Sequence, residues 1–247
     1  MQIDTHCHLS YEDYNNLNEV VKNIDIAITS GTNDKTNKEV LDVISKYNNI
    51  YGTLGIHPED IDSISDNSFK FIEENLNNKK IVAIGEIGLD YYWVKDNKEE
   101  QKALLRRQME IAEKYNMPVV IHSREAALDT YEILKDYNVK GVIHCFSYSL
   151  DMAKKFIKLG YKIGIGGVIT FKNSKKLVEV VENINLDDIL LETDSPYLAP
   201  EPLRGTKNVP YNTYYIAKKI AEIKDVNIDS VFTITTQNSV KLFDIKL

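Results

Sequence analysis

The sequence predicts a single-domain α/β protein with the (β/α)8 TIM-barrel fold, and three observations support this. Segments rich in β-branched residues recur eight times, amphipathic segments alternate with them, and no linker or low-complexity tract divides the 247 residues. Alternating strands and helices imply parallel strands joined by crossovers, and eight such units close a barrel. We therefore expect residues 1–247 to form one domain. The alternative, an open doubly wound sheet, needs a topological switch point, and no glycine-rich nucleotide loop marks one.

Each expected strand is a short β-branched or aliphatic segment flanked by turn-forming residues. In chain order the strands are 1–8 (MQIDTHCH), 24–30 (IDIAITS), 50–56 (IYGTLGI), 81–87 (IVAIGEI), 117–122 (MPVVIH), 140–146 (KGVIHCF), 161–169 (YKIGIGGVI) and 188–193 (DILLET). Glycines 164, 166 and 167 in the seventh strand resemble a phosphate cradle, but glycine in a barrel strand more often permits a close backbone approach or a bulge.

The expected helices have apolar residues on one face. They are 36–47, 68–77, 98–116, 125–136, 151–159, 175–183, 212–224 and 228–243. In 151–159, Met152, Phe156 and Leu159 share a face, and Gly160 follows as a C-cap.

Composition narrows the class of protein without fixing its partner. A net charge of −7 and a pI of about 5.3 argue against a broad basic surface for nucleic acid, although bound divalent cations can supply positive charge for a phosphate substrate. Two cysteines, Cys7 and Cys145, give no disulfide framework, and we expect both to be buried. We see no apolar run long enough for a membrane span and no signal peptide, and we expect a cytoplasmic protein with no obligate protein partner.

The histidines all stand near the expected C-terminal ends of strands, where barrel enzymes carry their chemistry. They are His6, His8, His57, His122 and His144. Glu86 and Asp194 lie near the ends of the fourth and eighth strands in the same way. A shared site explains this distribution better than five independent core histidines.

The spacing of His6 and His8 has a physical interpretation. Side chains two residues apart on a strand project to the same side, so both imidazoles can reach one cation, while Cys7 between them points toward the helices. Asp4 shares the inward face, either as a core polar residue or as a partner of the ligands.

Together these residues offer more ligands than one tetrahedral zinc ion uses. The six candidates are His6, His8, Glu86, His122, His144 and Asp194. A donor set of nitrogen and oxygen without thiolate is typical of a binuclear hydrolytic centre, and Glu86 is the candidate to bridge the two cations. Magnesium suits the carboxylates, whereas manganese or zinc suits the imidazoles, so the metal stays open.

The chain also resembles the TatD-type metal-dependent deoxyribonucleases of the amidohydrolase superfamily. The resemblance rests on DTHCHL (4–9), GIHP (55–58), GEIGLDYYW (85–93), PVVIHSREA (118–126), GVIHCFS (141–147), ETDSPYLAPEPLRGTKNVP (192–210) and QNSVKLF (237–243). It implies the same six metal ligands. Two departures, Tyr148 after HCFS and Thr206 in RGT, touch no ligand and bear on substrate fit.

The resemblance implies hydrolysis of DNA phosphodiester bonds through a metal-bridging hydroxide. Asp194 is expected as the general base and Glu86 as the bridging carboxylate. We expect 3′–5′ exonuclease activity on single-stranded ends, because a narrow barrel mouth accepts a chain end more readily than a duplex. His57, Arg124 and Arg204 are the candidates for substrate binding. The aromatic residues Tyr91, Tyr92, Trp93 and Tyr197 are candidates for stacking on bases, with loop packing as the alternative.

Two alternative functions remain. The same centre would serve an amidohydrolase-type enzyme that cleaves a small amide, ester or phosphotriester, because an activated water does not by itself select carbon or phosphorus. A metal-binding barrel without catalysis is the other alternative, although no ligand of the set is missing.

Overall fold

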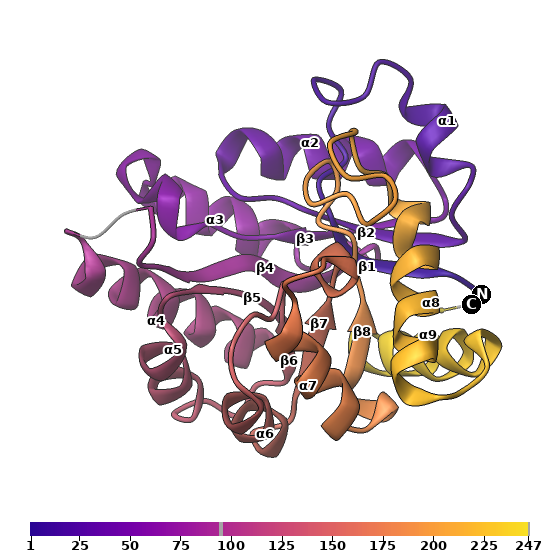
Figure 1. The fold of residues 1–247 in the computed structure, drawn as a ribbon. Helices are drawn as coiled ribbons and strands as arrows, with labels where there is room; N and C mark the ends of the chain where they lie inside the picture. The colour runs from indigo at the N-terminus through magenta and orange to yellow at the C-terminus, as the bar shows by residue number, and fades with distance from the viewer. Residues whose placement is uncertain (94–95, 247) are drawn as a thin grey trace.

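Eight parallel strands form a single sheet whose spatial order is the order of the chain, β1 to β8 (Figure 1). The computed structural model describes residues 1–93 and 96–246. Its strands are β1 (Ile3–Cys7), β2 (Ile26–Ser30), β3 (Ile50–Leu54), β4 (Ile81–Asp90), β5 (Val119–Arg124), β6 (Gly141–Ile143), β7 (Tyr161–Ile165) and β8 (Ile189–Leu191). The predicted (β/α)8 TIM barrel is thereby confirmed.

The sheet closes where the segment after β8 meets β1. Cys7 forms an isolated parallel bridge with Ser195, and the hydroxyl of Thr5 donates to the carbonyl of Leu191 at 2.9 Å. Beside them, the buried carboxylate of Asp4 accepts from the backbone N–H and the hydroxyl of Thr193. These contacts join the first strand, β1, to the last strand, β8, and to the segment that follows it.

Helices surround the sheet (Figure 1). They are α1 (Leu17–Val21), α2 (Asp34–Lys46), α3 (Asp66–Asn75), α4 (Lys98–Tyr115), α5 (Ala127–Leu134), α6 (Leu150–Lys158), α7 (Lys175–Asn183), α8 (Thr213–Lys224) and α9 (Ile228–Phe243). Among the described residues there are also four 3-10 helices, η1 (Pro58–Ser63), η2 (Gly167–Thr170), η3 (Leu186–Asp188) and η4 (Pro210–Asn212). The eight expected helices are present with small shifts of their ends. Helix α1 was not predicted, because its five residues are too few for a periodic pattern.

Two apolar layers hold the barrel. The larger cluster lies between strands and helices and includes Cys7, whose thiol donates to the carbonyl of Ile28 at 3.3 Å. The smaller cluster joins residues of β1, β2, β4, β5, β6 and β8 to Phe243 and Ile245 at the end of α9. Its members from the even strands are Ile26, Ile28, Val82, Ala83, Val142 and Leu190.

Several predicted strand ends were wrong, and two of these errors affect the site. We expected the fourth strand to stop at residue 87 and the fifth at 122, but β4 continues to Asp90 and β5 to Arg124. The two strands pair over this extension, with Gly88 opposite His122 and Asp90 opposite Arg124. Glu86 and His122 therefore lie within strands rather than at their ends. The sixth and seventh strands are shorter than expected, and η2 takes the place of the predicted end of the seventh.

Among the residues that the structure describes, no helix is both long enough and apolar enough to cross a lipid bilayer.

Candidate metal centre

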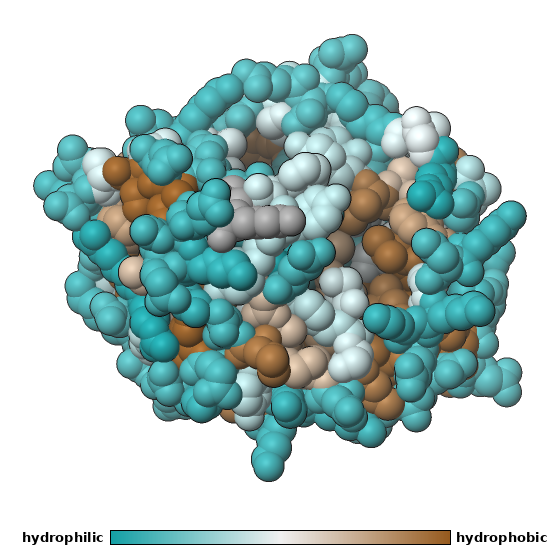
Figure 2. All heavy atoms as spheres, turned by 60° about the vertical axis from the view of Figure 1, so that its left-hand side comes forward, coloured by the Kyte–Doolittle hydropathy of each residue, from teal (hydrophilic) through white to brown (hydrophobic). Residues whose placement is uncertain are grey.

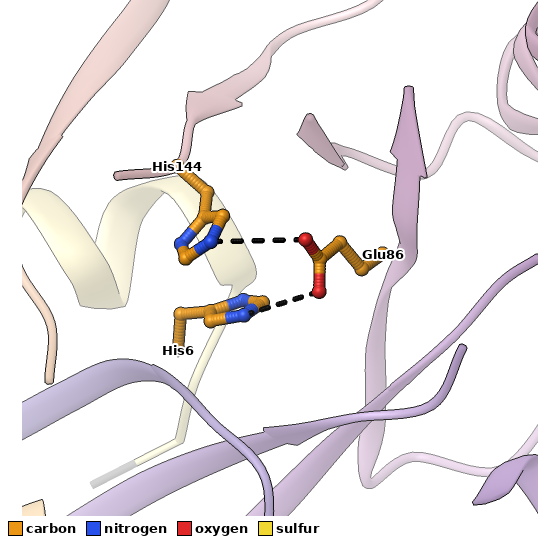
Figure 3. Close-up of side chains that lie close together, drawn as sticks. All are labelled: His6, Glu86 and His144. Carbon is orange, nitrogen blue, oxygen red and sulfur yellow. Dashed lines mark ion pairs between the residues drawn. The ribbon is translucent and has the colours of Figure 1, made fainter. Parts of the chain in front are cut away.

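The carboxylate of Glu86 lies at the centre of the histidine cluster. Its Oε2 lies 3.4 Å from His6 Nε2 and its Oε1 lies 3.7 Å from His144 Nε2, so the two oxygens face imidazoles from β1 and from the segment after β6 (Figure 3). The other imidazoles divide in the same way. Oε2 lies 3.5 Å from His8 Nε2, whereas Oε1 lies 2.9 Å from His122 Nδ1. A carboxylate whose oxygens face two sets of donors is suited to bridge two cations.

Ser30, the last residue of β2, orients His6 and His8. His8 Nδ1 lies 3.1 Å from the carbonyl oxygen of Ser30, which can only accept, so this nitrogen donates and carries the proton. His6 Nδ1 lies 3.1 Å from the hydroxyl of Ser30, and this hydroxyl accepts from the Thr53 hydroxyl at 3.0 Å. Both Nε2 atoms consequently face the same space and lie 3.3 Å apart.

Two carboxylates that the sequence analysis did not select hold His122 and His144. Asp90 Oδ2 lies 3.0 Å from His122 Nε2, and Glu192 Oε1 lies 3.1 Å from His144 Nδ1. Asp90 and Glu192 are both fully buried. The opposite ring nitrogen of each histidine faces Glu86. Their position along the chain could have revealed these two carboxylates, since Asp90 is the last residue of β4 and Glu192 directly follows β8.

Asp194 completes the cluster from the segment after β8. Its backbone has φ 56°, a left-handed conformation that aspartate tolerates better than most residues. Its Oδ1 lies 3.8 Å from His6 Nε2, 3.6 Å from His8 Nε2 and 4.0 Å from His144 Nε2. The structure thus brings all six predicted ligands together.

The charges of the cluster favour a bound cation. Burial acts to raise the pKa of Glu86, but the imidazoles of His6 and His144 outweigh it and hold that pKa well below its usual range. Burial acts to lower the pKa of His122, but the hydrogen bonds to Asp90 and Glu86 raise it to about 9. For His144, the charges of Glu192 and Glu86 likewise overcome burial and raise the pKa to about 10. The carboxylates therefore draw positive charge into the cluster.

The donor separations fit metal ions. Two donors on one tetrahedral cation at about 2.1 Å lie about 3.4 Å from each other. Within the described residues, three donor groups of this kind are His6–His8–Asp194, His6–Glu86–His144 and His57–Glu86–His122, each with its ligand atoms within 4.8 Å of one another. Cys145 lies within the same range of His144 and Asp194. Burial raises the pKa of its thiol well above the usual range, which disfavours the thiolate that a metal needs.

His57 stands apart from the ligands because of its tautomer. The backbone N–H of Glu59 donates to His57 Nδ1 at 3.2 Å, so the proton of the neutral ring is on Nε2. Burial lowers the pKa of His57 to about 3, which keeps the ring neutral. Its Nε2 lies 3.6 Å from Glu86 Oε1. In this tautomer Nε2–H faces the centre as a hydrogen-bond donor.

The cluster opens into a cleft of about 710 Å³. The described residues that line it include His57, Arg124, Trp93 and Tyr197, and Arg204 is missing from this set. The Arg124 guanidinium lies 4.1 Å from the centre of the Tyr92 ring and 5.3 Å from the Trp93 ring. Hydrophilic residues dominate the face shown in Figure 2.

Three of the candidates, Tyr91, Tyr92 and Arg204, are not among the described residues that line the cleft. The Arg204 guanidinium lies over the ring of Phe171, 4.3 Å from its centre. Tyr91 is 8% exposed and its hydroxyl donates to Asp129, so it packs in the loop, whereas Trp93 and Tyr197 are 62% and 60% exposed.

Tyr148, one of the two departures from the family pattern, braces the segment that carries Arg124. Its hydroxyl accepts from the backbone N–H of Ala126 at 3.1 Å and lies 2.9 Å from the hydroxyl of Ser123. Thr206, the other departure, donates from its hydroxyl to the carbonyl of Leu203 at 2.7 Å and closes a turn.

Comparison with known proteins agrees with this site. The family model "TatD related DNase" matches residues 3–244. An uncharacterized metal-dependent hydrolase of Bacillus subtilis is 38% identical over 254 residues, covering 99% of this chain and 100% of the relative. An uncharacterized metal-dependent hydrolase of Escherichia coli is 33% identical over 258 residues, covering 98% and 96%. The crystal structure of a TatD homolog from Escherichia coli matches with a TM-score of 0.91 and 31% identity, over 99% of this chain and 98% of that chain.

The family match spans the whole barrel, including both ends of the seam between β1 and the segment after β8. The chain therefore belongs to the TatD related DNase family of metal-dependent hydrolases.

Proposed function

We propose that the chain is a 3′–5′ exodeoxyribonuclease that removes nucleotides from single-stranded DNA ends with the help of two divalent cations, Mg²⁺, Mn²⁺ or Zn²⁺. The observation that carries the proposal is the division of the Glu86 oxygens, Oε2 toward His6 and His8 and Oε1 toward His122 and His144. This arrangement supports one cation on each side of Glu86. The description of the matching family as a DNase supports DNA as the substrate.

The other five ligands are assigned to the two sides of Glu86. His6, His8 and Asp194 are assigned to one side, and His122 and His144 to the other. When bound, such cations polarise a phosphate oxygen and lower the pKa of the attacking water. Asp194 is proposed as the general base, because its side chain is 16% exposed to the cleft and its carboxylate is held ionised by the neighbouring imidazoles.

Two donors are proposed to hold the scissile phosphate. His57 presents Nε2–H to the centre, a neutral donor that does not compete for a cation. Arg124 lines the same cleft and can offer two N–H groups to phosphate oxygens. Arg204 was the third candidate, but its packing on Phe171 gives it no direct support.

The cleft supports the recognition of a chain end. On one side it is lined by exposed or half-buried carboxylates from the segment after β1, from α2 and from η1: Glu12, Asp13, Glu39, Glu59 and Asp60. Lys35 there pairs with only the first of them, Glu12. Negative charges there repel a phosphate backbone that continues past the centre. Arg124, Trp93 and Tyr197 leave the remaining walls suited to phosphate and unpaired bases. A DNA strand that ends at the centre avoids the acidic wall, whereas a DNA strand that continues past the centre has to run along it.

The test uses metal-stripped protein with Mg²⁺, Mn²⁺ or Zn²⁺ added back. Single-stranded oligonucleotides labelled at the 5′ end are supplied with a free or a blocked 3′ end, beside the matching duplex. We expect stepwise shortening of the free strand, slower attack on the duplex and little attack on the blocked strand. Equal degradation of blocked and free strands would contradict end recognition. Turnover of acylated amino acids with no turnover of DNA would favour the amidohydrolase alternative instead.

A further inference from the structure

The imidazoles on the two sides of Glu86 are held by chemically different partners. His6 and His8 both turn their Nδ1 atoms to Ser30, a neutral residue, with distances of 3.1 Å each. His122 and His144 turn one nitrogen each to a buried carboxylate, Asp90 at 3.0 Å and Glu192 at 3.1 Å.

We infer that Asp90 and Glu192 are positioning residues that act on only one of the two cations, the one assigned to His122 and His144, and that Ser30 acts on the other. The inference rests on the ligand assignment of the proposed function, and it concerns residues that bind no cation themselves. A carboxylate that accepts the far N–H of a metal-binding imidazole fixes its tautomer and increases its electron donation to the metal. A carbonyl also fixes the tautomer and a hydroxyl orients the ring, but neither brings a negative charge.

Asp90 is built into the structure as a fixed partner. Its Oδ1 accepts from the backbone N–H groups of Tyr92 and Trp93 at 2.8 and 2.9 Å, which leaves Oδ2 for His122 Nε2. The backbone N–H of Asp90 donates to the side chain of Gln101 from α4 at 2.8 Å. The carboxylate therefore cannot turn away from His122 without breaking the loop that follows β4.

Glu192 is fixed by one hydrogen bond and by packing, and its contact with His144 Nδ1 is an ion pair. Its Oε1 accepts from the backbone N–H of Cys145 at 2.5 Å, next to His144 itself. The side chain lies against Gly164 of β7, where a methyl group would stand only 2.4 Å from Oε2. Glycine at 164 therefore leaves the space that this carboxylate occupies, which is the close approach expected of a glycine in a barrel strand.

The two carboxylates have the same relation to the centre although they come from opposite parts of the chain. Each is 0% exposed, each contacts the ring nitrogen that faces away from Glu86, and neither is among the described residues that line the cleft. A role in substrate binding does not account for that placement, whereas a role in holding one cation does.

The test is a calorimetric titration of metal-stripped protein with Mn²⁺, in which the wild type is expected to bind two ions. Asp90→Asn and Glu192→Gln should each weaken one binding step by about 10–100-fold and leave the other step unchanged. The double variant should weaken that same step alone. Ser30→Ala keeps the backbone carbonyl that faces His8 but removes the hydroxyl that faces His6, so it should weaken the other step, and combining it with Asp90→Asn should weaken both. Gly164→Ala should imitate Glu192→Gln, because its methyl group displaces the carboxylate.

Matched controls are the surface residues Asp136, which pairs with Arg106, and Glu73, which pairs with Lys114. Asp136→Asn and Glu73→Gln should change neither step. The inference is overturned if Asp90→Asn and Glu192→Gln weaken different steps, weaken both steps equally or change neither. Should one variant fail to fold by circular dichroism, the other and Gly164→Ala decide the matter. Glu86→Gln separates the two proposals: if it leaves both steps intact, the ligand assignment itself fails.

Discussion

The backbone N–H of Asp194 donates a hydrogen bond to the carbonyl of His6 at 3.0 Å, so the last proposed ligand in the sequence is tied directly to the first. The next bond along this seam runs from the N–H of His8 to the carbonyl of Ser195 at 2.7 Å. The hydrogen bonds that close the barrel therefore also position His6, His8 and Asp194 in the centre. A change that loosens the seam should loosen the site as well.

Asp4 tests this coupling. Its Oδ1 accepts from the backbone N–H groups of His6 and Thr193 at 3.2 and 2.9 Å, in a fully buried position. Asp4→Ala leaves these donors without their acceptor, and we expect a loss of about 2–4 kcal/mol in the free energy of unfolding. Hydrolytic activity should fall in the same variant under conditions where it remains folded. Urea denaturation and rate measurements would check both, and a stable variant with full activity would refute the coupling.

His57 distinguishes substrate binding from metal binding. If its Nε2–H contacts the phosphate, His57→Ala should lower kcat/KM for DNA by about 10–100-fold, the effect of losing a hydrogen bond to a charged group. The number of bound Mn²⁺ ions should stay at the wild-type value. Steady-state kinetics with metal analysis of the same sample gives both answers. A loss of one metal ion would show that His57 is a ligand after all.

Trp93 and Tyr197 are expected to stack on bases near the 3′ end. Trp93→Ala and Tyr197→Ala should each raise KM for single-stranded DNA by about 5–100-fold, since one stacked base contributes about 1–3 kcal/mol. Rates on a small phosphodiester without bases should change little. Tyr211→Ala is the matched control, because Tyr211 is also exposed, at 38%, but is not among the described residues of the cleft. Equal effects of all three variants would contradict stacking.

Metal binding should depend on pH in a definite direction. Without metal, the pKa values of His122 and His144 are raised to about 9 and about 10, above the ordinary 6.5. The protonated rings therefore stabilise the metal-free protein fully below pH 6.5, and this contribution is lost as pH rises through 9 to 10. Since cations compete with these protons, Mn²⁺ affinity should rise from neutral pH toward about pH 9, with release of protons. Calorimetry in buffers of different ionisation enthalpy measures that release, and an affinity independent of pH would contradict it.

The barrel could be predicted from the sequence because its signal is repeated. Eight β-branched segments alternate with amphipathic ones, and an error at one boundary does not change the class. The six proposed ligands could be selected because all of them, except for small errors at β4 and β5, stand toward the same end of their strands. His6 and His8 also satisfy the rule that residues two apart on a strand share a face.

The partners of the ligands were missed for physical reasons. Asp90 was placed beyond the fourth strand, because the sequence does not reveal that β4 continues beside β5 to Arg124. Glu192 lies beyond the last residue of β8, where strict alternation no longer predicts direction. The sequence also could not predict that Trp93 is exposed while Tyr91 is buried, because neighbouring aromatic residues in a loop follow no periodic pattern.

Glu86→Gln tests the central claim most directly. The variant keeps the size of the side chain but removes the charge that faces both sides of the centre. We predict that both Mn²⁺ binding steps weaken and that the rate of 3′-end shortening of single-stranded DNA falls by about 10³-fold or more, by analogy with the loss of a principal electrostatic group. Two tightly bound ions with an undiminished rate of DNA hydrolysis would contradict the account.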